Sequence, residues 1–521
     1  MKLRWLAIGM ALAAPAAAEG ENPWFAQGRT AVAEARALSR ASKPAKNVIV
    51  FLGDGMGLTT ITAARILDGQ SRGESGEENQ LAFERLPHVC LVKTYNTNQQ
   101  VPDSAGTMTA ILSGAKTRAE VIGLDETVPV GDAVAAATGH LPSLIEQAED
   151  RGLATGVITT ARITHATPAA AFAHTPQRSW ENDTQLSSQA RATDFPDIAR
   201  QLVEWPHGDG LDVVLGGGRQ QLMPREMADP EYRDARGRRA DGRDLIAEWR
   251  ARHPEGRYVW NLEEFEAVDP AQTSKLLGLF QPDHMNFELD RANDPAGEPS
   301  LAQLTEKALA MLARNPKGYV LLVEGGRIDH AHHFGNAYRA LVDTIAFSDA
   351  VRVAMQNTDA DETLIVVTAD HGHVMTLGGY PTRGNPILGK VVSNDRESGE
   401  PNVEFEKDQT GLPYTTIGYH NGPGARGPAA AGGARVAPQA AHRDLTEIDT
   451  GNPEFRQVAA VPLRAETHSA EDVPVYAGGP ASELFHGVQE QSYLYHAMVE
   501  ALGWRDGPAR RSPHAIRKAT D

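Results

Sequence analysis

The sequence contains carboxylate and imidazole side chains of the kinds that bind zinc, although they lie far apart along the chain. They are Asp54, Glu324, Asp329, His333, Asp370, His371 and His468. Zinc binds imidazole nitrogen together with carboxylate oxygen, whereas a harder ion such as magnesium takes oxygen ligands only. Asp329 and His333 are four residues apart, so both face one way if a helical turn carries them. Either this pair or the adjacent Asp370 and His371 could simply satisfy backbone groups, so the prediction of a metal centre rests on their clustering.

A serine that could act as a nucleophile lies at the start of a predicted helix. Ser104, within the segment 102–107, precedes the helical run Met108–Leu112. At a helix start, free backbone amides and the positive end of the helix dipole favour an anion. The same spacing also fits a helix that Asp103 or Ser104 merely caps. A serine hydroxyl is a poor nucleophile at its own pKa, and coordination to zinc would make it usable near neutral pH, which favours a hydrolase.

The elements that must bring these side chains together follow the pattern of a mostly parallel sheet. Short β-branched runs alternate with helical patterns such as Ser143–Arg151 and Ala337–Met355. The predicted strands are 47–52, 89–95, 154–159, 212–215, 319–323 and 363–368. In such sheets the working residues follow the carboxyl ends of the strands. Three of the runs lead into Asp54, Glu324 and Asp370, so we expect these acids at one edge of the sheet.

A Gly-, Pro- and Ala-rich stretch interrupts this alternation between residues 375 and 465, and we interpret it as an insertion. The segment 428–441 within it is of low complexity. We therefore predict an α/β domain built from residues 19–374 and 466–503, with the insertion at 375–465. A closing helix is expected at Glu490–Leu502, and the tail at 504–521 is expected to fray.

The composition excludes several classes of protein. With 521 residues, 41% hydrophobic and 23% charged, the chain is not a disordered, collagen-like or disulfide-rich protein. A formal net charge of −18 disfavours binding to nucleic acid, so local charge or bound metal must attract any anionic substrate. Cys90 is the single cysteine, so no intrachain disulfide can form.

The N-terminus has the pattern of a secretory signal peptide. Lys2 and Arg4 precede an apolar run from Trp5 to about Ala14, and small residues up to Ala18 form a cleavage site. The run is shorter than the about 20 residues that a membrane span needs. We therefore predict that residues 1–18 are removed near Ala18, and that the mature protein is periplasmic or secreted, without a membrane anchor.

Several blocks of the chain resemble alkaline phosphatases. The blocks are Gly53–Gly57, Asp103–Thr107, Val323–His330, Thr368–His371, Gly378–Tyr380, Asn421–Gly424, Glu466–Asp472 and His486–Gln491. The resemblance spans roughly residues 47–503. It implies an α/β fold in three layers, with a large, mostly parallel central sheet and a crown-like inserted subdomain. It also implies a homodimer, a state about which the residues themselves say nothing.

The resemblance implies a role for each candidate residue. The first zinc would be bound by Asp329, His333 and His468, and the second by Asp54, Asp370 and His371. Asp54 would also reach a third site, usually magnesium, together with Glu324 and Thr167. Ser104 would be the nucleophile, and Arg178 would hold the phosphate through its planar pair of donors.

Two positions near the third site vary among alkaline phosphatases, and this chain has histidine at both, as animal-type members do. We expect His165 and His330 to act beside the metal ligands, where an imidazole changes the electrostatics of the third site. Animal-type members also carry a calcium site, whose ligands here would be Glu231, Phe280 and Glu298. Gln281 stands where an acid is usual, so this site has lost a charge and calcium binding is doubtful.

The implied reaction is hydrolysis of many phosphate monoesters in two steps through phospho-Ser104, with two zinc ions and one magnesium ion. A related phosphodiesterase, phosphonate hydrolase or sulfatase shares the metal-on-sheet design and remains an alternative. Sulfatases need Pro-x-Arg after their nucleophile, whereas Ala105, Gly106 and Thr107 follow Ser104. A metal- or phosphate-binding protein without turnover is a further alternative, although it would not need Ser104 or Arg178.

Overall fold

The computed structural model describes residues 22–38, 43–425 and 443–504. The predicted signal peptide at 1–18 with its cleavage near Ala18, the low-complexity segment 428–441 and the tail from residue 505 lie outside the described residues. Within the described ranges, no helix combines the length and the apolar character needed to cross a membrane.

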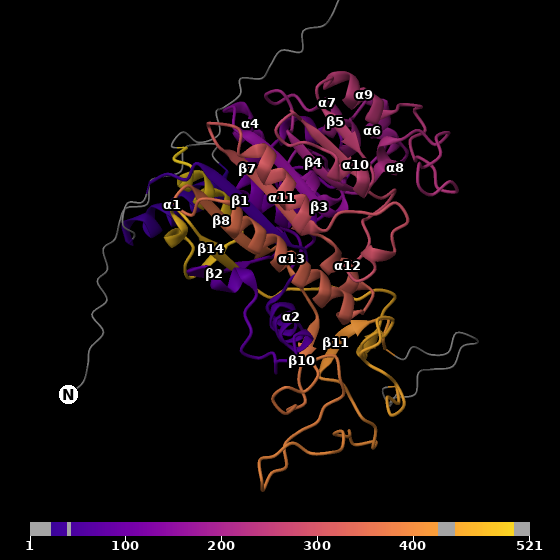
Figure 1. Cartoon of the computed structure of the whole chain (residues 1–521). Coiled ribbons are helices and arrows are strands. Elements are labelled where there is room, and N and C mark those ends of the chain that lie inside the picture. The colour runs from indigo at the N-terminus through magenta and orange to yellow at the C-terminus, as the bar shows by residue number, and fades with distance from the viewer. Residues whose placement is uncertain (1–21, 39–42, 426–442, 505–521) are drawn as a thin grey trace, which may run out of the picture.

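The centre of the molecule is a ten-stranded sheet (Figure 1). In spatial order its strands are β15 (Val488–Glu490), β2 (His88–Lys93), β14 (Val473–Gly478), β8 (Thr363–Ala369), β1 (Asn47–Gly53), β7 (Tyr319–Gly325), β3 (Ala154–Arg162), β4 (Val213–Gly217), β6 (Leu276–Leu279) and β5 (Arg257–Val259). Only β14 runs against its neighbours, β8 and β2. The expectation of a mostly parallel sheet is confirmed, and each of the six predicted strands is present.

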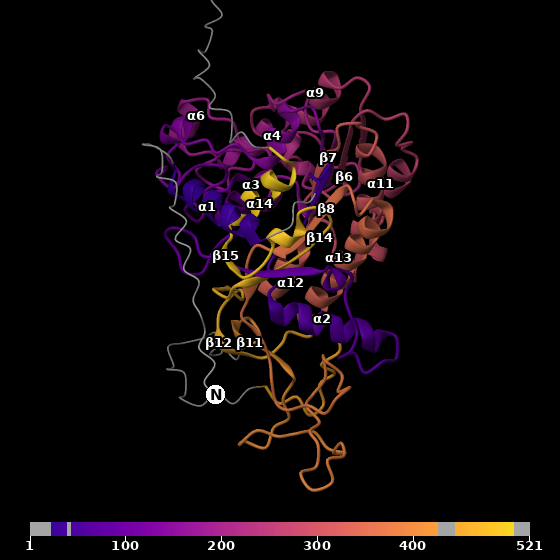
Figure 2. The ribbon, with the colours of Figure 1, turned by 90° about the vertical axis from the view of Figure 1, so that its left-hand side faces the viewer.

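Helices cover both faces of the sheet. In Figure 2, α1, α3, α4 and α14 lie on one side of the central strands and α11 and α13 on the other. The helices are α1 (Pro23–Leu38), α2 (Leu58–Ser71), α3 (Ser104–Ser113), α4 (Leu144–Asp150), α5 (Ala166–Ala169), α6 (Ser188–Ala192), α7 (Ile198–Glu204), α8 (Arg219–Leu222), α9 (Leu245–Arg252), α10 (Leu262–Glu266), α11 (Leu301–Leu312), α12 (Arg327–His333), α13 (Ala337–Asn357) and α14 (Tyr493–Ala501). Because helices shield both faces, β1, β7 and β8 are buried along their whole length and are almost entirely apolar.

The register of the three central strands aligns their carboxyl ends. Leu52 of β1 pairs with Glu324 of β7, and Gly53 of β1 pairs with Ala369 of β8. Asp54 and Asp370, the residues that follow β1 and β8, therefore emerge beside Glu324. This confirms the expectation that three strand ends deliver acids to one edge of the sheet.

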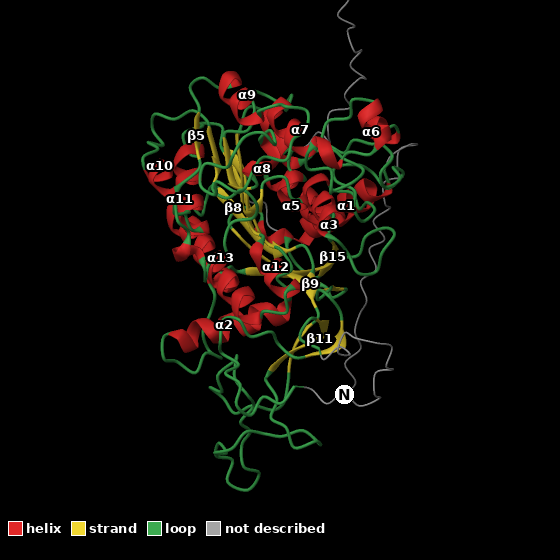
Figure 3. Cartoon of the chain, turned by 90° about the vertical axis from the view of Figure 1, so that its right-hand side faces the viewer, coloured by secondary structure: helices red, strands yellow, loops and turns green. Residues whose placement is uncertain are grey.

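A small second sheet lies beyond this edge. It consists of β10 (Met375–Leu377), β11 (Ile417–Gly422) and β12 (Ala459–Pro462). A long loop joins β10 to β11, as Figure 3 shows. The return from this region forms a two-stranded ladder in which β13 (His468–Ser469) pairs with β9 (Gly372–His373), and this ladder brings His468 next to the end of β8. The small sheet falls within the segment 375–465, whose division from the α/β domain stays a prediction.

Candidate metal centre and active site

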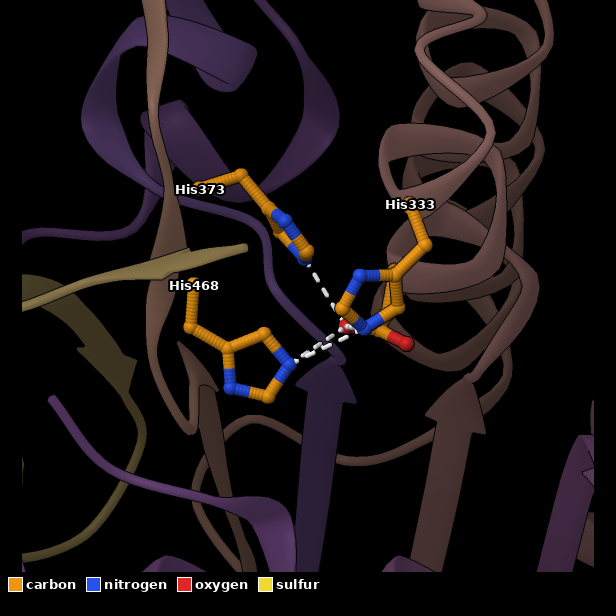
Figure 4. Close-up of side chains that lie close together, drawn as sticks. His333, His373 and His468 are labelled. Carbon is orange, nitrogen blue, oxygen red and sulfur yellow. Dashed lines mark hydrogen bonds and ion pairs between the residues drawn. The ribbon is translucent and has the colours of Figure 1, made fainter. Parts of the chain in front are cut away.

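The first group of candidate ligands converges on one carboxylate oxygen. Asp329 Oδ1 lies 3.3 Å from Nε2 of His333 and 3.3 Å from Nε2 of His468 (Figure 4). Asp329 and His333 share α12, so the four-residue spacing places them on one face of a helical turn as expected. His373 also reaches this oxygen, with its Nε2 at 2.8 Å. These four residues form a group that could hold a metal ion.

Backbone carbonyls fix the tautomers of the two predicted histidine ligands. His333 donates from Nδ1 to the carbonyl oxygen of Glu466 at 2.6 Å, and His468 donates from Nδ1 to that of Pro102 at 2.8 Å. A neutral imidazole then has its lone pair on Nε2. The two Nε2 atoms lie 3.1 Å apart, where two lone pairs would repel each other unless a proton or a cation lies between them. This donor set fits zinc.

The second group contacts the hydroxyl of Ser104 through His371. His371 Nε2 lies 3.5 Å from Asp54 Oδ1, 3.3 Å from Asp370 Oδ2 and 3.2 Å from Ser104 Oγ. The rings of His371 and His468 are stacked with their centroids 3.6 Å apart, so the two groups of ligands are neighbours. The structure therefore brings the six residues predicted to bind zinc into two neighbouring groups, one of which contacts Ser104.

The buried carboxylates of these two groups repel one another, and a bound cation would stabilise them. Burial raises the pKa of Asp54 well above its usual value, and repulsion by Asp370 and Asp329 adds to the effect. Asp54 Oδ1 is buried without a hydrogen-bond partner. Burial lowers the pKa of His371 well below its usual value, which keeps the ring neutral and able to coordinate a metal. A bound cation would compensate the carboxylates and use the neutral imidazole.

The third group contains Glu324, Asp54 and His165 and could also hold a metal ion. Glu324 Oε2 accepts a hydrogen bond from the hydroxyl of Thr159, whereas its Oε1 is buried without a partner. Burial raises the pKa of Glu324 to about 8. The hydroxyl of Thr167 donates to Asp54 Oδ2 at 3.4 Å, so Thr167 lies where the resemblance implies. The oxygen donors fit a hard ion such as magnesium, and His165 adds one nitrogen.

Ser104 is the first residue of α3, and the structure decides between the two candidate caps of that helix. Asp103 Oδ1 accepts a hydrogen bond from the backbone N–H of Gly106 at 3.1 Å, which makes Asp103 the N-cap. The hydroxyl of Ser104 is therefore not needed for capping and faces His371. The side chain is only 2% exposed.

Arg178 contacts Asp103, the residue that precedes Ser104. Its Nη1 donates to Asp103 Oδ2 at 3.1 Å, and its Nη2 lies 3.1 Å from His165 Nε2. Burial alone would lower the pKa of Arg178, but Asp103 and Glu120 outweigh it, so the guanidinium stays charged. A cation with two parallel donors, held by the residue before Ser104, is suited to binding a phosphate group.

The two histidines at the variable positions lie together, and a third joins them. The ring centroids of His165 and His330 are 5.4 Å apart, and that of His284 is 4.1 Å from His330. Burial lowers the pKa of all three rings well below the usual value, so the group is neutral. Sequence reasoning missed His284 because nothing in its local sequence relates it to residue 330.

Sequence reasoning also missed His373 and the role of Glu466. His373 donates from Nδ1 to Glu466 Oε2 at 2.5 Å and from Nε2 to Asp329 Oδ1 at 2.8 Å. Burial would lower the pKa of His373, but Glu466 and Asp329 outweigh it and raise this pKa to about 10. The spacing of two residues from His371 was the available signal, because residues i and i+2 share a face of extended chain.

Two residues of the doubtful calcium site, Glu231 and Gln281, already bind other side chains. Arg219 Nη2 donates to Glu231 Oε2 at 2.7 Å, and the amide of Gln281 donates to Asp294 Oδ1 at 2.5 Å. Glu298 keeps one buried oxygen without a partner, and burial raises its pKa to about 7. Phe280, which precedes Gln281 in the sequence, is buried. Calcium binding stays a doubtful prediction, because a guanidinium already faces Glu231.

Comparison with protein families and with known proteins points to alkaline phosphatases. A model of the family described as alkaline phosphatase matches residues 45–504. The tissue-nonspecific alkaline phosphatase of Gallus gallus is 43% identical, over 92% of this chain and 88% of that protein. The Homo sapiens isozyme of the same name is 40% identical, over 95% of this chain and 92% of that protein.

Solved structures agree on the fold. The alkaline phosphatase of Thermus thermophilus superposes with a TM-score of 0.61 at 24% identity, covering 89% of this chain and 92% of that one. The alkaline phosphatase of the Antarctic bacterium TAB5 gives 0.58 at 22% identity, covering 89% of this chain and 100% of that one.

Proposed function

Because the chain belongs to the alkaline phosphatase family, and is thus a hydrolase of phosphate monoesters, we propose that it acts through a phosphoserine formed on Ser104. The observation that carries this proposal is the Ser104 hydroxyl, held 3.2 Å from His371 Nε2 between two groups of metal ligands. Asp103 rather than Ser104 caps the helix, which leaves the hydroxyl available for chemistry.

Two zinc ions and one magnesium ion would complete the site. We assign the first zinc to Asp329, His333 and His468, the second to Asp54, Asp370 and His371, and magnesium to Asp54, Glu324 and Thr167. When bound, the ions lower the pKa of coordinated hydroxyl groups and neutralise charge on the reacting phosphate and on the leaving oxygen. The unpartnered oxygens of Asp54 and Glu324 support this assignment.

The chain's own residues perform two displacements at phosphorus. Ser104 Oγ forms a bond to phosphorus while the bond to the ester oxygen breaks, and the alcohol leaves. A water oxygen then bonds to phosphorus while the serine–phosphorus bond breaks, which releases phosphate and restores the hydroxyl. Arg178 holds two phosphate oxygens throughout, and Asp103, which accepts from it at 3.1 Å, keeps it oriented. Two inversions give retention of configuration at phosphorus.

Metal analysis combined with a substrate comparison tests this proposal. We expect the purified protein to contain about two zinc ions and one magnesium ion per chain, and to hydrolyse an aryl phosphate monoester at least about a hundredfold faster than the corresponding diester or sulfate. Faster turnover of the diester or the sulfate would favour a related hydrolase. Zinc-loaded protein that releases no phosphate would contradict the proposal as a whole.

Further properties are proposed together with this function: export from the pattern of the N-terminal residues, broad substrate range from the proposed reaction, and a homodimer from the resemblance alone. They are broad substrate range, a homodimer, and export to the periplasm or the medium after cleavage near Ala18. Size-exclusion chromatography with light scattering tests the dimer, and N-terminal sequencing of the exported protein tests the cleavage.

His373 is expected to strengthen zinc binding although it is not assigned as a ligand. Its bond to Asp329 orients that carboxylate, and Glu466 holds the ring. We expect His373→Gln to lower zinc affinity by about 10- to 100-fold, since removal of such supporting partners has that effect. Competition with a chromophoric chelator measures the affinity. His253→Gln, which removes a histidine that packs against Trp249, is the control, and equal affinities for the two variants would contradict this role.

A further inference from the structure

A largely buried histidine, whose side chain is 12% exposed, lies at the start of the segment that carries Arg178. His174 donates from Nε2 to Glu146 Oε1 at 2.8 Å and from Nδ1 to the carbonyl oxygen of Gly123 at 2.7 Å. Both partners are acceptors, whereas a neutral imidazole has only one N–H. Both bonds therefore form only when the ring is an imidazolium. Burial would lower the pKa of His174, but Glu146 and Gly123 outweigh it and raise this pKa.

The groups around His174 favour a positive charge on its ring. Glu146 is 3% exposed on α4, where its second oxygen accepts from the backbone N–H of Ser143 at 2.8 Å. His140 stacks on His174 with ring centroids 4.4 Å apart, and burial lowers the pKa of His140 to about 4, which keeps that ring neutral. His207 also contacts Glu146 Oε1, at 3.1 Å, from the loop after α7.

The contacts of His174 hold two backbone segments against each other. These segments, 120–123 and 174–178, are called the two strips below. Gly123 has a φ of +63°, and a Cβ there would lie 2.6 Å from His174 Nδ1, so only glycine permits this approach. The amide of Ile122 donates to the carbonyl of Thr175, and that of Thr175 donates back to Ile122, both at 2.9 Å. The strips are thus joined next to the ion pair.

The far ends of the same two strips meet the active site. The backbone N–H of Arg178 donates to the carbonyl of Glu120 at 2.8 Å, and the N–H of Glu120 donates to Asp103 Oδ2 at 3.0 Å. Asp103 also accepts from the guanidinium of Arg178 and precedes Ser104. A displacement of His174 would therefore be passed along a few hydrogen bonds to Arg178.

We propose that the ion pair between His174 and the buried Glu146 positions Arg178 for binding the phosphate group. His174 is a positioning residue, because it touches neither Arg178 nor the serine and acts through the strips 120–123 and 174–178. The inference rests on the proposed role of Arg178 as a phosphate ligand. Neutralising Glu146 leaves the imidazolium buried without its counter-ion, so the ring must lose its proton or move.

A double-mutant cycle on the metal-loaded enzyme tests this inference, with inorganic phosphate as the probe. We expect Arg178→Ala to raise the inhibition constant of phosphate by about 100-fold, and Glu146→Gln to raise it by about tenfold in the Arg178 background. In the Arg178→Ala background, Glu146→Gln should change the constant by less than about twofold, because the group that it positions is gone. His174→Gln should behave in the same way as Glu146→Gln.

His207→Gln is the matched control, since His207 contacts the same carboxylate but lies outside the two strips. We expect it to leave phosphate inhibition within about twofold of the unmodified enzyme. Three results would each overturn the inference. Glu146→Gln could raise the inhibition constant of phosphate equally in both backgrounds, or leave it unchanged in the Arg178 background. His207→Gln could also raise this constant as much as Glu146→Gln does. An Arg178→Ala variant that binds phosphate normally would instead overturn the proposed role of Arg178.

Discussion

Replacing Ser104 with alanine is expected to lower the rate of phosphate monoester hydrolysis by at least about a thousandfold, because the group that forms the covalent intermediate is lost. The ligands around the serine are unaffected by the change, since Asp103 rather than Ser104 caps α3. Residual slow hydrolysis by direct attack of water is compatible with this expectation. The remaining rate would come from the metals and Arg178, which bind the phosphate whether or not the serine is present.

The measurement is acid-quench trapping of labelled phosphate on the protein, together with steady-state rates. We expect the label on the unmodified chain and none on Ser104→Ala. Ser113→Ala is the matched control, because Ser113 is buried at the other end of the same helix. This control should retain both the label and the rate. Label of equal amount on Ser104→Ala would refute the assignment of the nucleophile.

The central strands could be predicted because their signal is local. Strands of a parallel sheet covered on both faces are continuous apolar runs, and 47–53, 319–325 and 363–369 are of this kind. The strand β14, at 473–478, is not among the six predicted strands, and nothing in its local sequence shows which way it runs relative to its neighbours. Its antiparallel pairing with β8 and β2 depends on contacts more than a hundred residues away in the chain.

The residues of the candidate site also fall into those that local sequence predicts and those that depend on distant parts of the chain. Asp54 and Asp370 could be predicted because each follows a strand, and Asp329 with His333 because a helical spacing relates them. His373 could not be assigned, since its importance comes from Glu466, which is distant in sequence. The alternatives at Asp103 and Ser104 stayed open for a related reason. A cap is defined by the bond that its side chain accepts, and spacing alone does not show that bond.

Replacing Asp329 with asparagine is the second change with a large expected effect. One oxygen of this carboxylate faces His333, His373 and His468. Burial would raise the pKa of Asp329, but these imidazoles outweigh it and hold it well below its usual value, so the group is an anion. An amide offers neither the charge nor the ligand strength, so we expect Asp329→Asn to lose zinc from the first site and at least about a hundredfold in rate.

A buried acid on the next helix provides the control for this change. Asp343 on α13 is 6% exposed, and burial raises its pKa well above the usual value, as it does for the acids of the candidate site, but Asp343 belongs to none of the three groups that could hold a metal ion. We expect Asp343→Asn to keep its zinc content and its rate within about twofold. The zinc content is measured by inductively coupled plasma mass spectrometry after dialysis, and the rate of hydrolysis is measured on an aryl phosphate. If Asp329→Asn kept the zinc content and the rate of Asp343→Asn, the carboxylate would be structural, and the metal centre would have to be assigned to other residues.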